Sequence, residues 1–268
     1  MKKITTNVYV ESELSVCNSS CVVTKDGVVV IDTPMVPANA KKHAAAILKF
    51  GQVRYVINTE PHGDHISGNC YFGGTHIAHD GTRDAILASK VEDIKGMLQM
   101  ISPGAALDND FRYRPSDITF SHRLTFYLGD HSFHLFNMPG HSPHQIAVYV
   151  PEERIIFTSD NISRGLPFFR QALPAEWLKT LKELQKFDVD YVVPGHGDVG
   201  DKSCITEMQK TVSTWINTVK EAIAKGMTLK EVQQKVTMHK QFPDLPRDER
   251  TTGVVSMNVT RLYEVLKK

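Results

Sequence analysis

The amino-acid sequence predicts a layered α/β fold in which helices cover β-sheets. Short apolar runs rich in Val and Ile, which are typical of strands, alternate with longer amphipathic stretches, which are typical of helices. Helical patterns alone fill the chain from about residue 203 onward. At 268 residues the chain is long enough to bury a large core, and no linker rich in Gly, Ser or Pro divides it. We therefore expect one domain over residues 1–268.

The first predicted elements are a β-hairpin and a helix. Residues 20–24 and 28–32 are apolar runs on either side of Lys25-Asp26-Gly27, and an Asp-Gly turn between such runs is a strong hairpin signal. The Ala- and Lys-rich residues 38–50 follow Pro37. Because proline is favoured at the first position of a helix, this stretch predicts a helix.

The alternation continues through the rest of the chain. Pro174 begins an amphipathic stretch with four apolar residues on one face, and Thr228 and Glu231 have the spacing of a helix-capping box. The elements expected in this part are a strand over 53–59, a helix over 82–100, short strands within 117–158, a helix over 174–187, a strand over 191–193, and C-terminal helices of which the last covers 253–266.

Charge and hydropathy exclude several classes of protein. Lys and Arg number 31 against 30 Asp and Glu, and they are scattered, so no global charge favours binding to nucleic acid or to an anionic membrane. The longest apolar run, Val28–Ile31, is too short to span a bilayer. No apolar export segment follows Lys2-Lys3. We expect a cytoplasmic protein, and four cysteines fit that reducing compartment.

The segment after the strand at 53–59 concentrates residues that bind metals. Glu60, His62, Asp64 and His65 place four potential ligands within six residues. In an extended chain the side chains of residues 60, 62 and 64 project to one side. Oxygen and nitrogen ligands without thiolate suit Zn²⁺, Fe²⁺ or Mn²⁺. The sequence therefore predicts a metal site directly after this strand.

Three further candidate ligands also follow apolar strand patterns. His141 follows residues 133–136, Asp160 follows residues 154–157, and His196 follows residues 191–193. Ligand-binding residues collect at strand ends in layered α/β folds. Seven candidate ligands on four such loops are enough for two metal ions that share one bridging group.

These motifs together resemble the metallo-β-lactamase superfamily. The resemblance begins at the Asp26-Gly27 hairpin with its Asp32-Thr33 ending, and it extends over nearly the whole chain. The motifs that carry it are Glu60-x-His62-x-Asp64-His65, Gly140-His141, Ser159-Asp160 and Pro194-Gly195-His196-Gly197. It implies a four-layer αβ/βα sandwich with added C-terminal helices, and it implies a metal-dependent hydrolase.

The resemblance also implies a ligand set for two divalent metal ions, with zinc expected and iron or manganese as alternatives. The first metal would take Glu60, His62 and His141, the second would take Asp64, His65 and His196, and Asp160 would bridge them. A hydroxide held between the two ions would be the nucleophile, because two cations lower the pKa of water between them to ~7. Asp64 would be catalytic, orienting the hydroxide and later passing a proton.

Glu60 departs from the family pattern, in which the usual first ligand is a histidine. A carboxylate reaches a metal at a similar distance but adds a negative charge. It should therefore make the first site a weaker Lewis acid or favour a harder metal. The alternative is that Glu60 points away and leaves that site empty.

The resemblance implies hydrolysis of a small carbonyl compound: an ester, thioester, lactone or lactam. β-Lactamase-like activity, as main or side reaction, and a mononuclear iron sulfur dioxygenase are the alternatives. Asp160 favours a generalist hydrolase, because lactamases of the family usually lack an aspartate there. The expected partner is a small-molecule substrate, with a homodimer left open. The candidate substrate contacts are Arg164, Phe168, Phe169 and Arg170, in the segment after Asp160 that is expected to lie over the site, and Met35 on the opposite wall. The competing interpretation is that these side chains only pack in the core.

Overall fold

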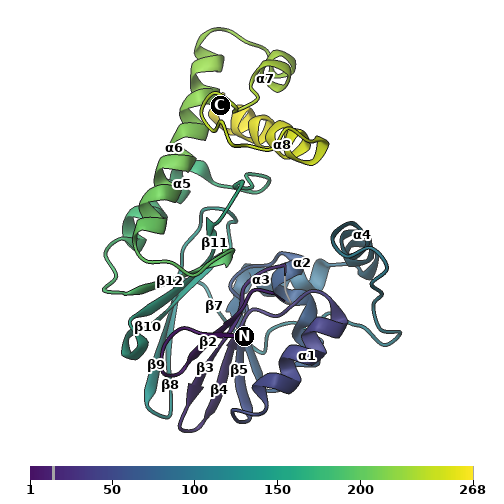
Figure 1. Ribbon diagram of the computed structural model, residues 1–268, viewed down its shortest axis with the longest axis vertical. Helices are drawn as coiled ribbons and strands as arrows, with labels where there is room; N and C mark the ends of the chain where they lie inside the picture. Colours follow the sequence, from purple (N-terminus) through teal and green to yellow (C-terminus); the bar gives the residue numbers. More distant parts are fainter. Residues whose placement is uncertain (14–15, 268) are drawn as a thin grey trace.

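The computed structural model describes residues 1–13 and 16–267 and arranges them as helix, sheet, sheet and helix layers (Figure 1). This arrangement confirms the predicted four-layer sandwich. The first sheet contains, in spatial order, β1 (Lys2–Lys3), β2 (Val8–Glu11), β3 (Ser19–Thr24), β4 (Gly27–Ile31), β5 (Val53–Ile57), β6 (Thr75–His79) and β7 (Ile118–Phe120). The second sheet contains β12 (Tyr191–His196), β11 (Ile155–Ser163), β10 (Ile146–Val150), β9 (His131–Asn137) and β8 (Arg123–Leu128).

The predicted hairpin forms β3 and β4, which pair antiparallel with Thr24 opposite Gly27. Gly27 has a φ of 129°, and a Cβ there would lie 2.7 Å from the Gln52 carbonyl oxygen, so glycine suits this turn. From β4 onward the first sheet is parallel, because β4, β5, β6 and β7 pair in that direction. The carboxyl ends of these strands therefore meet at one edge.

The main core lies between the two sheets. Along β4, Val29 and Ile31 pack into this core, whereas Val28 and Val30 pack on the outer face of the sheet. Phe133 and Phe157 are among the residues that the second sheet contributes. The alternation explains why a nearly continuous apolar run is needed here, since both faces of the strand are buried.

Helices cover the two outer faces. On the side of the first sheet lie α1 (Pro37–Ile47), α2 (Gly63–Ile66), the 3₁₀ turn η1 (Ser67–Tyr71) and α3 (Asp80–Ala88). Helix α4 (Val91–Ile101) packs instead on the loop that contains Met35. On the second sheet lie α5 (Pro174–Leu184) and α6 (Ser203–Ala224), followed by α7 (Leu229–Lys235) and α8 (Glu249–Leu266), with the short turn η2 (Pro151–Glu153) between β10 and β11. Trp177 and Trp215 are buried where α5 and α6 meet. Within the described ranges, no helix is both long and apolar enough to cross a bilayer.

Two helix predictions were wrong in detail. The single helix expected over 82–100 is two helices, because Ser89 adopts an extended conformation with ψ 141° and its side chain bonds back to the Ala85 carbonyl. The last helix begins at Glu249 and not at Gly253, because Asp248 caps it by accepting a hydrogen bond of 2.7 Å from Thr251 N–H. The predicted capping box at Thr228 and Glu231 is confirmed at the start of α7.

Candidate metal centre

The structure brings together all seven side chains that the sequence predicted as ligands. They form overlapping groups whose nitrogen and oxygen atoms lie within 4.8 Å of one another. The groups are Glu60, His62 and His141; Asp64, His65 and His196; and Glu60, His65 and Asp160. The cluster sits at the carboxyl ends of β5, β9 and β12 and beside β11, so strands of both sheets position it.

Two of these side chains reach the cluster by a route that the sequence did not predict. β5 ends at Ile57, and Asp64 lies in the first turn of α2, so strand alternation does not place it beside Glu60 and His62. Asp160 does not follow a finished strand, because β11 continues to Ser163. The register of β11 shifts on both sides of Ser159, which has a φ of 50°, and this irregularity immediately precedes Asp160.

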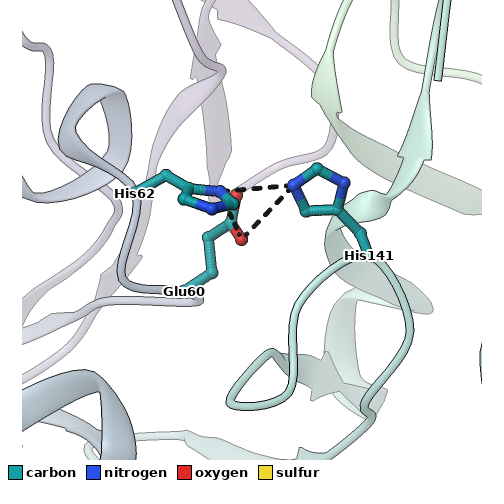
Figure 2. Close-up of side chains that lie close together, drawn as sticks. All are labelled: Glu60, His62 and His141. Atoms are coloured by element: carbon teal, nitrogen blue, oxygen red, sulfur yellow. Dashed lines mark hydrogen bonds and ion pairs between the residues drawn. The ribbon is translucent and has the colours of Figure 1, made fainter. Parts of the chain in front are cut away.

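Glu60 and His62 follow β5, His141 follows β9, and the three side chains point toward one another (Figure 2). Glu60 Oε2 lies 3.0 Å from His62 Nδ1 and 3.7 Å from His141 Nε2. The two imidazole nitrogens are 3.2 Å apart. One carboxylate oxygen and two ring nitrogens thus surround a common point, which is the donor set of a metal site.

The second group lies beside the first and shares two carboxylates with it. His196 Nε2 is 3.3 Å from Asp64 Oδ2 and 3.2 Å from Asp160 Oδ2. Asp160 also reaches His65 Nε2 at 3.4 Å and His141 Nε2 at 3.6 Å, so it contacts histidines of both groups. Glu60 does the same, since its Oε1 lies 3.2 Å from His65 Nε2.

In each of the four histidines, the ring nitrogen that faces away from the cluster contacts a supporting group. A contact of this kind fixes the orientation of the ring and which nitrogen faces the centre. The contacts join His62 Nε2 to Gln171 Oε1 (3.3 Å), His65 Nδ1 to Asp32 Oδ2 (2.9 Å), His141 Nδ1 to the Phe168 carbonyl (2.9 Å), and His196 Nδ1 to the Val16 carbonyl (2.6 Å).

Asp32 is the supporting residue whose role sequence reasoning missed. It directly follows β4 and has a φ of 56°, and its carboxylate accepts a hydrogen bond of 2.8 Å from Thr59 N–H while contacting His65. Burial raises the pKa of Asp32, and His65 opposes that rise. The sequence signal for Asp32 is the Asp32-Thr33 ending of the hairpin. The resemblance assigns this ending to the family pattern but not to the metal site.

The glycines before His141 and His196 allow β11 to approach closely. A Cβ on Gly195 would lie 1.8 Å from Asp160 Oδ1, and one on Gly140 would lie 2.2 Å from Asn161 Oδ1. Asn161 has no room to withdraw, because its side chain also accepts a bond from His141 N–H and donates one to the Met138 carbonyl. The Gly-His pairs are thus packing requirements of the cluster.

Protons and a metal ion compete for the same nitrogens. Burial alone would lower the pKa of His62 and of His196, but Glu60 raises the first to about 9, and Asp160 with Asp64 raises the second to about 11. With these pKa values and no cation bound, both rings should be imidazolium cations at neutral pH. A metal ion must displace the proton on the nitrogen that faces the cluster, so metal affinity should fall as pH falls. Calorimetry of zinc binding in buffers of different ionisation enthalpy should show proton release. Identical heats in all buffers would contradict this prediction, and His196→Gln should release fewer protons.

The candidate substrate residues occupy different environments. Phe168 is 39% exposed and Arg170 is exposed, whereas Phe169 is fully buried, with its ring centroid 5.1 Å from that of Trp177 and 5.8 Å from that of Trp215. Arg164 turns toward α6, where it contacts Cys204 at 3.1 Å and Glu207 at 3.7 Å. Met35 is fully buried in a small apolar cluster with residues of α4.

A two-sheet sandwich with histidines and carboxylates converging at the strand ends defines a class of candidate metal-dependent hydrolases. A family model described as the metallo-beta-lactamase superfamily matches residues 13–196. The chain belongs to the metallo-β-lactamase superfamily. The coarser expectations of the sequence, a hydrolase of this superfamily with metal-binding groups of residues, are thereby confirmed.

Relatives of two kinds are similar to this chain. The type 2 metallo-beta-lactamase of Elizabethkingia meningoseptica is 25% identical over 80% of this chain and 85% of its own length. A linear primary-alkylsulfatase of a Pseudomonas species is 23% identical over 89% of this chain and 53% of its own length. Among solved structures, a metallo-beta-lactamase from Pontibacter korlensis is 20% identical, with a TM-score of 0.62 over 79% of this chain and 97% of that one.

The sec-alkylsulfatase Pisa1 from Pseudomonas sp. has a TM-score of 0.76 at 13% identity, over 98% of this chain and 49% of that one. The chain spans about half the length of these alkylsulfatases. At such identities the two solved structures show the fold alone.

Proposed function

We propose that this protein is a hydrolase of a small carbonyl compound, an ester, thioester, lactone or lactam, and that it works with two divalent metal ions, zinc in the first instance. The observation that carries the proposal is the convergence of seven nitrogen- and oxygen-bearing side chains on one buried cluster. The substrate class follows from the family resemblance and not from the cluster itself.

The polar atoms at the middle of the cluster support a resident cation. Both carboxylate oxygens of Glu60, His65 Nε2 and Asp160 Oδ1 are buried and make no hydrogen bond among the described residues. Their contacts there are ion pairs between carboxylate and imidazole, at 3.0–3.4 Å. Buried polar atoms are normally paired, and buried charges are costly unless a partner compensates them. Divalent cations would compensate three buried or half-buried carboxylates while accepting the four imidazoles as ligands.

The chain's own residues would then divide the work. Glu60, His62 and His141 would hold one ion, Asp64, His65 and His196 the other, and Asp160 would bridge them. Two bound cations would supply Lewis acidity, which lowers the pKa of bound water and polarises a substrate oxygen. Although burial alone would raise it, His65 and His196 lower the pKa of Asp64 to about 2, so its carboxylate is ionised at neutral pH. With its side chain 16% exposed, Asp64 is available to orient water and to accept a proton.

Hydrolysis of a sulfate ester is the second candidate, and one observation favours it. A linear primary-alkylsulfatase is similar over 89% of this chain at 23% identity, whereas the Elizabethkingia type 2 metallo-beta-lactamase is similar over 80%. β-Lactam hydrolysis, as main or side reaction, is the third, because a type 2 metallo-beta-lactamase is among the relatives. An iron sulfur dioxygenase would differ from all three in its metal.

Metal analysis with a substrate panel tests the proposal. Protein purified without chelator should contain roughly one to two transition-metal ions per chain, zinc most abundantly. Chelation should abolish hydrolysis, and added metal should restore it. The panel should contain esters, thioesters, lactones, lactams, phosphodiesters and alkyl sulfates. Metal-free protein that turns over substrate at the full rate would overturn the proposal, and activity confined to alkyl sulfates would move it to the second candidate.

A further inference from the structure

One short segment supports both histidines of the first group. We call residues 165–172, between β11 and α5, the lip. The Phe168 carbonyl contacts His141 Nδ1 at 2.9 Å, and Gln171 Oε1 contacts His62 Nε2 at 3.3 Å. The imidazoles of the second group are held elsewhere, by Asp32 and by the Val16 carbonyl. The position of the lip therefore affects the orientation of His62 and His141 but not that of His65 and His196.

Helix α8 holds the lip at three points. Asn258 accepts a hydrogen bond of 2.8 Å from Phe169 N–H and donates one of 2.7 Å to the Pro167 carbonyl. Arg261, one turn further along α8, donates from Nη2 to the Ala172 carbonyl at 3.0 Å. Asn258 thus bridges the residues on either side of Phe168, whose carbonyl faces His141.

Asn258 is fully buried, and both ends of its amide are used by the lip backbone. The polypeptide at His141 is fixed separately, because Asn161 Oδ1 accepts from His141 N–H and the Gly140 carbonyl accepts from Leu173 N–H. What Asn258 adds is the direction of the Phe168 carbonyl and hence the rotation of the His141 ring. Residues that orient a metal-binding histidine typically change metal affinity roughly 10–100-fold when removed.

We propose that Asn258 is a positioning residue, through which α8 and the lip orient His62 and His141 for the first metal ion. It lies 62 residues beyond residue 196, where the family match ends, so this support comes from outside the matched core. The inference rests on the proposed metal centre.

The test is a stepwise zinc titration against a competing chelator, which yields two dissociation constants for the full-length protein. Asn258→Leu keeps the side-chain size but removes both hydrogen bonds, so it should weaken one constant roughly 10–100-fold and leave the other unchanged. Asn258→Asp keeps the acceptor for Phe169 N–H but sets a carboxylate oxygen against the Pro167 carbonyl, so it should weaken the same constant. Val259→Ala on the same helix is the matched control, because its side chain is buried in the apolar core, and it should change neither constant.

Nitrogen NMR of the His141 ring is a second readout that needs no metal. In the wild type Nδ1 should show the shift of a hydrogen-bonded N–H, and this signature should be lost in Asn258→Leu but kept in Val259→Ala. If Asn258→Leu does not fold, Asn258→Asp and Arg261→Met report on the same contacts. Unchanged zinc constants in folded Asn258 variants, or equal weakening of both, would overturn the inference alone. A wild type that binds no zinc would overturn the proposed function as well.

Discussion

Replacing Asp160 by alanine is expected to lower kcat by at least ~10²-fold, the scale for removing a preorganised electrostatic partner. Asp160, like Glu60, contacts histidines of both groups, at 3.4 Å from His65, 3.6 Å from His141 and 3.2 Å from His196. Its removal should therefore reduce occupancy of both metal positions and not of one. Steady-state kinetics on the best panel substrate, paired with elemental analysis of the same preparation, measure the two effects together.

The charge of Asp160, more than its shape, should account for this effect. Burial would raise its pKa, but His196 and His65 hold the pKa well below the usual range, so the group is ionised at neutral pH. Asp160→Asn should thus be nearly as damaging as Asp160→Ala. Asp110→Asn, which removes an exposed carboxylate outside the cluster, is the matched control and should behave as wild type. Wild-type turnover at wild-type metal content in either Asp160 variant would show that Asp160 is not a ligand.

The layers and the convergence of the cluster were predictable because both depend on periodic burial. An Asp-Gly turn between apolar runs gave the β3–β4 hairpin, and histidines or carboxylates following apolar runs meet at one edge of a layered fold. The boundaries of individual helices, and the elements that carry individual ligands, were less predictable. The apolar stripe over 82–100 continues across Ser89, so periodicity alone did not reveal the break between α3 and α4. Alternation along an extended chain likewise placed Asp64 beside Glu60 and His62, whereas Asp64 lies in α2.

The supporting contacts could not be predicted, for a different reason. The carbonyls of Val16 and Phe168 hold His196 and His141, and a backbone carbonyl leaves no trace in residue type. Asn258 contacts the lip from 89 residues away, and nothing in its local sequence distinguishes it from a surface polar residue of a helix. An aromatic pair near the site likewise did not reveal that Phe169 is buried while Phe168 is exposed.

Replacing Glu60 by alanine is expected to leave the protein with fewer than two metal ions, lost chiefly from the group with His62 and His141. The structure favours Glu60 as a ligand, since the side chain is fully buried and points at both rings (Figure 2). Burial would raise the pKa of Glu60, but His62 and His141 lower it, so a carboxylate faces the metal position. Because Oε1 also lies 3.2 Å from His65 Nε2, the second group should weaken too, though less.

Two further variants separate the donor atom from its charge. Glu60→His restores the residue usual in the superfamily and should still bind two metals, with altered metal preference because the net charge of the site rises by one. Glu60→Gln keeps an oxygen donor without the charge and should lie between Glu60→Ala and wild type. Anomalous diffraction at the zinc edge would locate the ions in all three variants, and stoichiometry would count them. If Glu60→Ala holds two metals as tightly as wild type, Glu60 is not a ligand. The argument that its charge lowers the Lewis acidity of the first site then fails as well.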